Sequence, residues 1–89
     1  MAEKKEVLGN AVDRFMRRLY ANVADESGIE GVYDLVMREV ERRVIAATLD
    51  FTGGNKLKTA KILGLNRNTV LKKIRDLGLD DKMKGRKSE

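Results

Sequence analysis

Two short predicted helices meet across a glycine in the stretch Gly54-Asn55-Lys56-Leu57-Lys58-Thr59-Ala60-Lys61-Ile62-Leu63-Gly64-Leu65-Asn66-Arg67-Asn68-Thr69-Val70-Leu71-Lys72-Lys73-Ile74. Asn55 and Asn66 each stand where a helix N-cap belongs, so we predict helices over residues 56–63 and 67–77. Gly64 lies between them, where glycine adopts a positive φ at no steric cost. Two helices joined by a glycine-containing turn are typical of a helix-turn-helix unit.

Small and apolar residues are spaced in this stretch so that the two helices can pack together. Ala60 lies four residues before Gly64, and its small side chain lets the second helix approach the first. Leu65 is placed to fill the junction, and Gly78 is placed to end the second helix. The residues that we expect to face inward are Leu57, Ala60, Leu63, Val70, Leu71, Ile74 and Leu77.

Polar residues gather at the end of the second helix that such a unit inserts into the major groove of DNA. Arg67 carries the fork that pairs with guanine O6 and N7, and Thr69 has a hydroxyl suited to phosphates or base edges. For Asn66, a role as helix cap explains the residue as well as a DNA contact does. For Arg67 and Lys73, the simple alternative is a side chain that faces solvent. The candidate DNA-binding residues are Asn55, Lys56, Lys58, Asn66, Arg67, Asn68, Thr69, Lys72 and Lys73.

The charge of the chain is unevenly distributed. The net charge of the 89 residues is +5, yet residues 53–89 hold eleven basic and four acidic side chains, whereas residues 1–52 hold eight and ten. Seven basic residues and no acidic one lie from Lys56 to Arg75. A solvated helix face usually mixes both signs because i,i+4 pairs stabilise it. The run therefore favours an anionic partner.

Two longer amphipathic helices are predicted before this unit. Apolar residues recur at steps of three and four over about residues 7–24 and again over about residues 32–52. The second helix would be roughly 30 Å long, and one short chain cannot surround it. We therefore expect a second copy to cover it, with a monomeric packing of the two helices as the alternative. The expected interface residues are Phe15, Leu19, Val36, Val40 and Val44.

The chain is expected to form one small all-α domain in four parts. Residues 1–6 form a flexible N-terminus, residues 7–52 a two-helix dimerisation core, and residues 53–79 the helix-turn-helix unit. Residues 80–89 form a basic tail that adds salt-dependent affinity for DNA.

Composition excludes several classes of function. The chain contains no cysteine and no histidine, so disulfides, thiolate chemistry and the usual general base are absent. No apolar run approaches the roughly 20 residues of a membrane span, and no signal peptide is visible. Glu39, Glu41 and Asp50 lie on one predicted continuous helix in an arrangement that offers no plausible catalytic acid–base pair or metal site. We expect no catalysis, no cofactor and no small-molecule ligand, in a cytoplasmic protein.

The stretch quoted first resembles the helix-turn-helix of Fis, the factor for inversion stimulation, which also closes the NtrC class of enhancer-binding activators. The run Val32-Tyr33-Asp34-Leu35-Val36-Met37-Arg38-Glu39-Val40-Glu41-Arg42 resembles the long second helix of Fis, so the likeness covers about residues 8–79. It implies a four-helix, intertwined homodimer whose last two helices bind DNA, and a duplex that bends to meet both copies. The family's DNA contacts then fall on Asn55, Asn66, Arg67, Thr69, Lys72 and Lys73.

Three functions are open at this point. The resemblance implies a Fis-like DNA-binding and DNA-bending homodimer that acts in nucleoid organisation and transcription regulation, and the likeness over residues 32–42 favours it. The alternative is the isolated C-terminal DNA-binding domain of an NtrC-type, sigma54-dependent activator. A helical adaptor whose basic end binds an acidic protein is the third.

Two departures from the Fis pattern are visible. Leu57 stands where Fis has a small hydroxyl residue, so Lys56 or Lys58 would hold the phosphate instead. About seven residues precede Leu8, so the N-terminal arm of Fis is expected to be missing.

Overall fold

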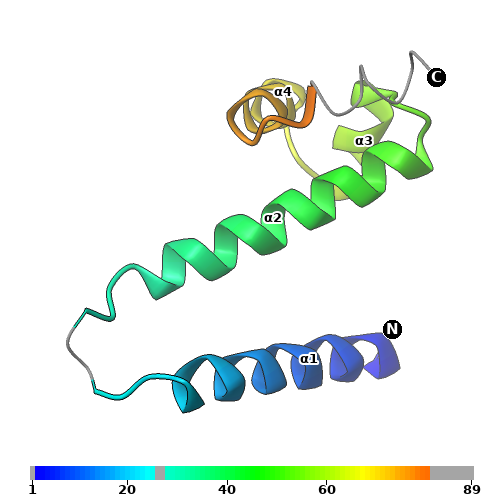
Figure 1. Ribbon diagram of the computed structural model, residues 1–89. Coiled ribbons are helices and arrows are strands. Elements are labelled where there is room, and N and C mark those ends of the chain that lie inside the picture. The colour runs from blue at the N-terminus through cyan, green and yellow to red at the C-terminus, as the bar shows by residue number, and fades with distance from the viewer. Residues whose placement is uncertain (1, 26–27, 81–89) are drawn as a thin grey trace. The chain divides into compact units, whose positions relative to one another are not determined.

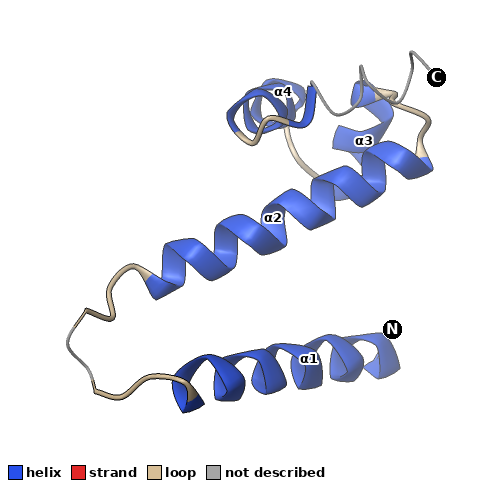
Figure 2. Cartoon of the chain, in the orientation of Figure 1, coloured by secondary structure: helices blue, strands red, loops and turns tan. Residues whose placement is uncertain are grey.

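A computed structural model of the chain shows four α-helices (Figures 1 and 2). It describes residues 2–25 and 28–80, and no strand lies within these ranges. The helices are α1 (Ala2–Ala21), α2 (Val32–Phe51), α3 (Lys56–Leu63) and α4 (Arg67–Asp76). The all-α class is therefore confirmed. The chain divides into two compact units, Met1–Glu30 and Gly31–Glu89, which are described in turn.

α1, the helix of the first unit, begins earlier than the sequence pattern indicated. A flexible segment was expected over residues 1–6, but the helix already starts at Ala2. Residues 3–6 are Glu and Lys, which favour helix. This segment is therefore helical although it has no apolar period. Glu3 in the first turn and Arg18 in the last complement the helix dipole. None of the described side chains of α1 is buried, and Phe15 is 48% exposed.

α2 is bounded by glycines at both ends. Gly31 precedes it in the left-handed conformation, with φ +71°, and provides no side-chain cap. The helix ends at Phe51, and Gly53 and Gly54 follow with φ of +68° and +88°. The positive φ values of this glycine pair stop the right-handed helix after Phe51.

The hydrophobic core of the second unit lies between α3, α4 and the C-terminal half of α2 (Figure 1). Thr59 is fully buried with this core, and its hydroxyl lies 2.8 Å from the hydroxyl of Thr52. The Thr52 hydroxyl also lies 3.2 Å from the carbonyl oxygens of Leu49 and Asn55, so the buried hydroxyls are satisfied. The apolar residues of the core are Ile45, Leu49, Ala60, Val70, Ile74 and Leu79.

The expected inward-facing set is confirmed except at one position. Ala60, Val70 and Ile74 are buried, and the other predicted leucines of this set are half-buried apart from Leu57. Leu57 is 64% exposed, so the prediction that it faces inward is wrong. The reason is that Thr59 takes the buried position, and Leu57 lies about 200° away from it around the helix.

The turn between α3 and α4 allows a test of backbone conformation alone. Gly64 has φ +74°, and nothing lies within 4 Å of the place where a Cβ would stand. Gly64→Ala is expected to lower the free energy of unfolding by about 1–2 kcal/mol, because alanine is strained in this region. Gly64→Asn should lose less, since asparagine tolerates it. Urea unfolding followed by circular dichroism at fixed protein concentration measures both, and equal losses would contradict this origin.

Candidate nucleic-acid interface

Two asparagine caps fix where α3 and α4 begin. Asn55 and Asn66 have extended backbones, and each side chain accepts a hydrogen bond from a backbone N–H of its helix. The donor is Lys58 at 2.9 Å in α3 and Asn68 at 2.8 Å in α4. Both predicted N-caps are confirmed. The caps determine the residue at which each helix starts, and so which side chains surround the N-terminal end of α4.

The N-terminal turn of α4 is exposed and polar. Asn66, Arg67, Asn68 and Thr69 are all exposed, whereas Val70, directly behind them, has no exposed surface. Within the part of the chain that the structure describes, Arg67 takes part in no ion pair. The free N–H groups and the positive dipole end of the helix add to the charge of Arg67. This end can therefore accept an anion without losing an existing contact.

Two of the candidate lysines are engaged with carboxylates. The Nζ of Lys56 lies 3.0 Å from Oδ1 of Asp80, and the Nζ of Lys73 lies 2.6 Å from Oε2 of Glu41. Sequence reasoning missed both pairs because the partners are 24 and 32 positions away, and no local pattern links them. These two lysines are thus less available to a partner than predicted.

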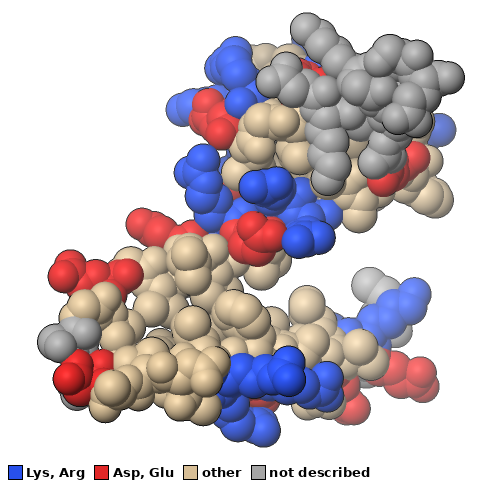
Figure 3. All heavy atoms as spheres, in the orientation of Figure 1, with Lys and Arg blue, Asp and Glu red and all other residues tan. Residues whose placement is uncertain are grey.

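The other two lysines remain free on the surface. Lys58 and Lys72 are exposed and form no ion pair among residues 28–80. Figure 3 shows basic side chains over the end of the second unit that carries α3 and α4, with acidic ones beside them. Asp80, the first residue of the predicted basic tail, is described and pairs with Lys56. The rest of the predicted tail, with Lys82, Lys84, Arg86 and Lys87, lies outside the described residues.

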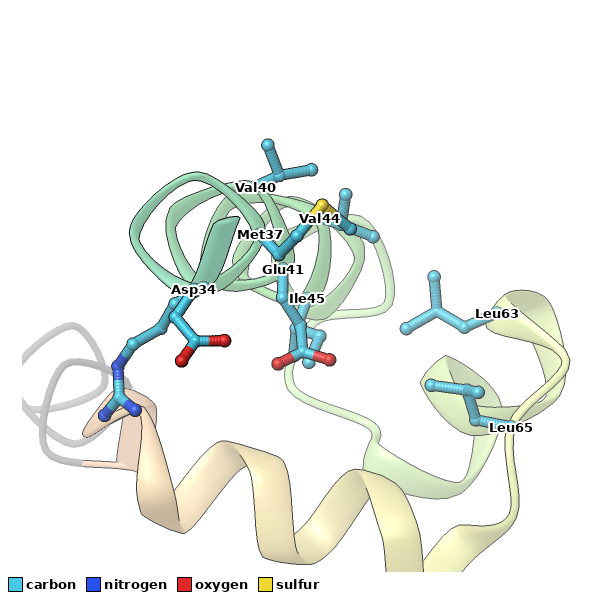
Figure 4. Close-up of a pocket in the computed structure, with 9 residues that line it drawn as sticks. Asp34, Met37, Val40, Glu41, Val44, Ile45, Leu63 and Leu65 are labelled. Atoms are coloured by element: carbon cyan, nitrogen blue, oxygen red, sulfur yellow. The ribbon is translucent and has the colours of Figure 1, made fainter. Parts of the chain in front are cut away.

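A groove of about 600 Å³ lies beside α2 in the second unit, lined by apolar side chains and by the charged Asp34, Arg38 and Glu41 (Figure 4). Val40 and Val44, two of the predicted interface residues, line it and are 37% and 46% exposed. Val36 is half-buried; in the other unit Leu19 is half-buried and Phe15 is exposed. The remaining apolar lining of the groove is Met37, Ile45, Leu63 and Leu65.

The described residues form neither a metal site nor a membrane span. No three carboxylates come together in an arrangement that could hold a metal ion. None of the described helices combines the length and apolar character that crossing a bilayer requires.

Comparison with known proteins gives consistent matches to bacterial regulators. Residues 36–77 match the family described as bacterial regulatory protein, Fis family. The DNA-binding transcriptional regulator NtrC of Azospirillum brasilense is 49% identical over 74 residues, which cover 83% of this chain and 15% of that protein. NtrC of Rhizobium meliloti is 46% identical over 72 residues, with 81% and 15% coverage. The chain thus spans about 15% of the length of these NtrC relatives.

A shorter relative is covered over most of its length. A Fis-like DNA-binding protein of Neisseria meningitidis is 44% identical over 57 residues, which are 62% of this chain and 72% of that protein. No solved structure matched the chain.

The capping role of Asn66 can be tested by its contribution to stability. Asn66→Ala removes the acceptor for the N–H of Asn68 and should lower the free energy of unfolding by about 1 kcal/mol. Asn66→Asp keeps the acceptor and adds a charge that the helix dipole favours, so stability should be retained. Urea unfolding measures both variants. A loss for Asn66→Asp as large as that for Asn66→Ala would show that the cap does not stabilise the helix.

Proposed function

Because this chain belongs to the Fis family of bacterial regulatory proteins, we propose that it is a transcription regulator that binds double-stranded DNA through α4. One observation carries the proposal: the exposed turn from Asn66 to Thr69 stands directly in front of the fully buried Val70. A DNA-recognition helix must present polar side chains to base edges from a fixed position, and a polar helix end anchored by a packed core meets this requirement.

The residues of this surface divide into those that recognise bases and those that bind the phosphate backbone. Arg67, exposed and unpaired in the described part of the chain, donates to O6 and N7 of a guanine in the major groove. Asn66 and Thr69 contact phosphates or base edges near it, while Asn66 continues to cap the helix. Lys58 and Lys72 neutralise phosphates on either side, which gives affinity that does not depend on sequence.

We also propose that two copies form a homodimer and present a pair of α4 helices to one duplex. The exposed apolar side chains of Val40 and Val44 in the groove and of Phe15 in α1 support this, since apolar surface is stabilised when a second copy covers it. Together with the resemblance to Fis, the dimer leads to a protein of the cytoplasm that bends DNA and contributes to nucleoid organisation.

The C-terminal DNA-binding part of an NtrC-type activator is a second candidate function, and the relatives favour it by coverage. The match to NtrC extends over 83% of this chain, whereas the match to the Fis-like protein covers 62%. In that case α4 would bind the DNA site and thereby position the remaining domains of a longer activator there. An antibody raised against residues 31–80 distinguishes the two in a cell extract, because it detects either a product of 89 residues or one several times larger.

A gel-shift titration on circularly permuted DNA fragments tests the proposed function. Wild-type protein should retard the fragments, and mobility should depend on the position of the site if the duplex is bent. Arg67→Ala should weaken binding by about 1–3 kcal/mol at a preferred site and by less on mixed sequence.

Arg43→Ala is the matched control for this experiment. Arg43 is an exposed arginine of α2, 2.9 Å from Glu39, so its loss changes the net charge equally without touching α4. Equal losses for Arg67→Ala on preferred and mixed DNA would remove Arg67 from the reading role. No retardation of any duplex in dilute buffer would refute DNA binding.

The proposed homodimer is tested by a charge placed in the groove. Val44→Asp should shift the protein to a monomer in sedimentation velocity at micromolar concentration, because a carboxylate is costly to bury in an apolar interface. Leu57→Asp, on the exposed side of α3, should leave the assembly unchanged. A wild-type protein that sediments as a monomer under these conditions would contradict the proposal.

A further inference from the structure

We infer that Glu41 withholds Lys73 from DNA and thereby limits the affinity of the protein for phosphates, an inference that rests on the proposed function. Glu41 lies on α2, and its carboxylate points from that helix toward α4 (Figure 4). The Nζ of Lys73 lies 2.6 Å from Oε2 of Glu41. A carboxylate oxygen at this distance occupies a donor that a phosphate oxygen would otherwise take.

Lys73 lies at the border between the exposed side of α4 and α2. It is four residues after the exposed Thr69, so the two side chains share one face of the helix. The side chain of Lys73 is 33% exposed and that of Glu41 is 39% exposed. The pair is therefore open to solvent, where an ion pair is weak and easily exchanged. A phosphate that approaches Thr69 therefore comes close to the ammonium of Lys73, which Glu41 holds.

The position of α4 does not depend on this ion pair. Val70 and Ile74 have no exposed surface and hold α4 in the core. Near its C-terminal end, Arg38 of α2 also donates to the backbone carbonyl oxygen of Asp76 at 3.4 Å. With α4 fixed in this way, loss of the Glu41 charge frees the ammonium of Lys73 without moving the helix.

Glu41→Gln tests the inference because it removes the charge and keeps the shape. Fluorescence anisotropy with a labelled mixed-sequence duplex at several salt concentrations gives the affinity and its salt dependence. The variant should bind roughly three- to tenfold more tightly, and the slope of log K against log salt should steepen by about 0.9, which corresponds to one additional phosphate contact.

Three comparison variants assign the gain to Lys73. Glu39→Gln makes the same change of charge two residues away, where the partner is Arg43 of the same helix, and it should leave the slope unchanged. Lys73→Gln should abolish the gain, so that Lys73→Gln and the double variant with Glu41→Gln bind equally. A gain that persists without Lys73, or an equal steepening for Glu39→Gln, overturns the inference. Weaker binding by Glu41→Gln also overturns it, because Glu41 would then position α4.

A measurement without DNA separates this inference from the proposed function. Reductive methylation followed by mass spectrometry should label Lys73 more slowly than the exposed Lys72, and Glu41→Gln should accelerate labelling at Lys73 several-fold. Equal rates in the wild-type protein would show that the pair does not form, and they overturn the inference whatever the DNA result. Failure of the wild-type protein to bind any duplex overturns the proposed function and the inference together.

Discussion

The burial of one side of α4 is the constraint on which the functional surface depends. Val70 and Ile74 share a buried cluster with Ile45 and Leu49 of α2, and none of the four is more than 1% exposed. Because these side chains allow α4 little rotation about its axis, the turn that precedes Val70 keeps its polar residues in solvent. The chemistry of the site therefore follows from packing behind it, and the caps at the two asparagines set its exact boundary along the chain.

The same packing divides the basic residues into two groups with different availability. Arg67 and Lys72 point to solvent and are unpaired in the described part of the chain, whereas Lys73 contacts a carboxylate of α2. Counting positive charges along α4 thus overestimates how many of them a polyanion meets. The acidic residues of α2 do more than balance charge, because Glu41 lies within reach of the proposed DNA-binding surface of α4.

The sequence predicted most of what depends on local geometry and little of what depends on contacts between helices. The caps at Asn55 and Asn66 and the positive φ of Gly64 follow from the chemistry of single residues, and the structure confirms them. The prediction that Leu57 faces inward was wrong because α3 turns Thr59, on its opposite side, toward the core. The Glu41–Lys73 pair was missed because it depends on how α4 is rotated against α2. The interface between copies stays a prediction, since its partner surface lies on another chain.

The hydroxyl pair of Thr52 and Thr59 has a consequence for how α3 selects its orientation. Leu57 and Thr59 lie on opposite sides of a two-turn helix, and burial of apolar area alone would favour the leucine. When Thr59 faces the core, its hydroxyl forms a directional 2.8 Å hydrogen bond with the hydroxyl of Thr52. A rotation of α3 that buried Leu57 in place of Thr59 would give up this bond. A polar pair in a small core thus acts as a discriminator between two competing arrangements, and it leaves a leucine in solvent beside the proposed DNA-binding surface.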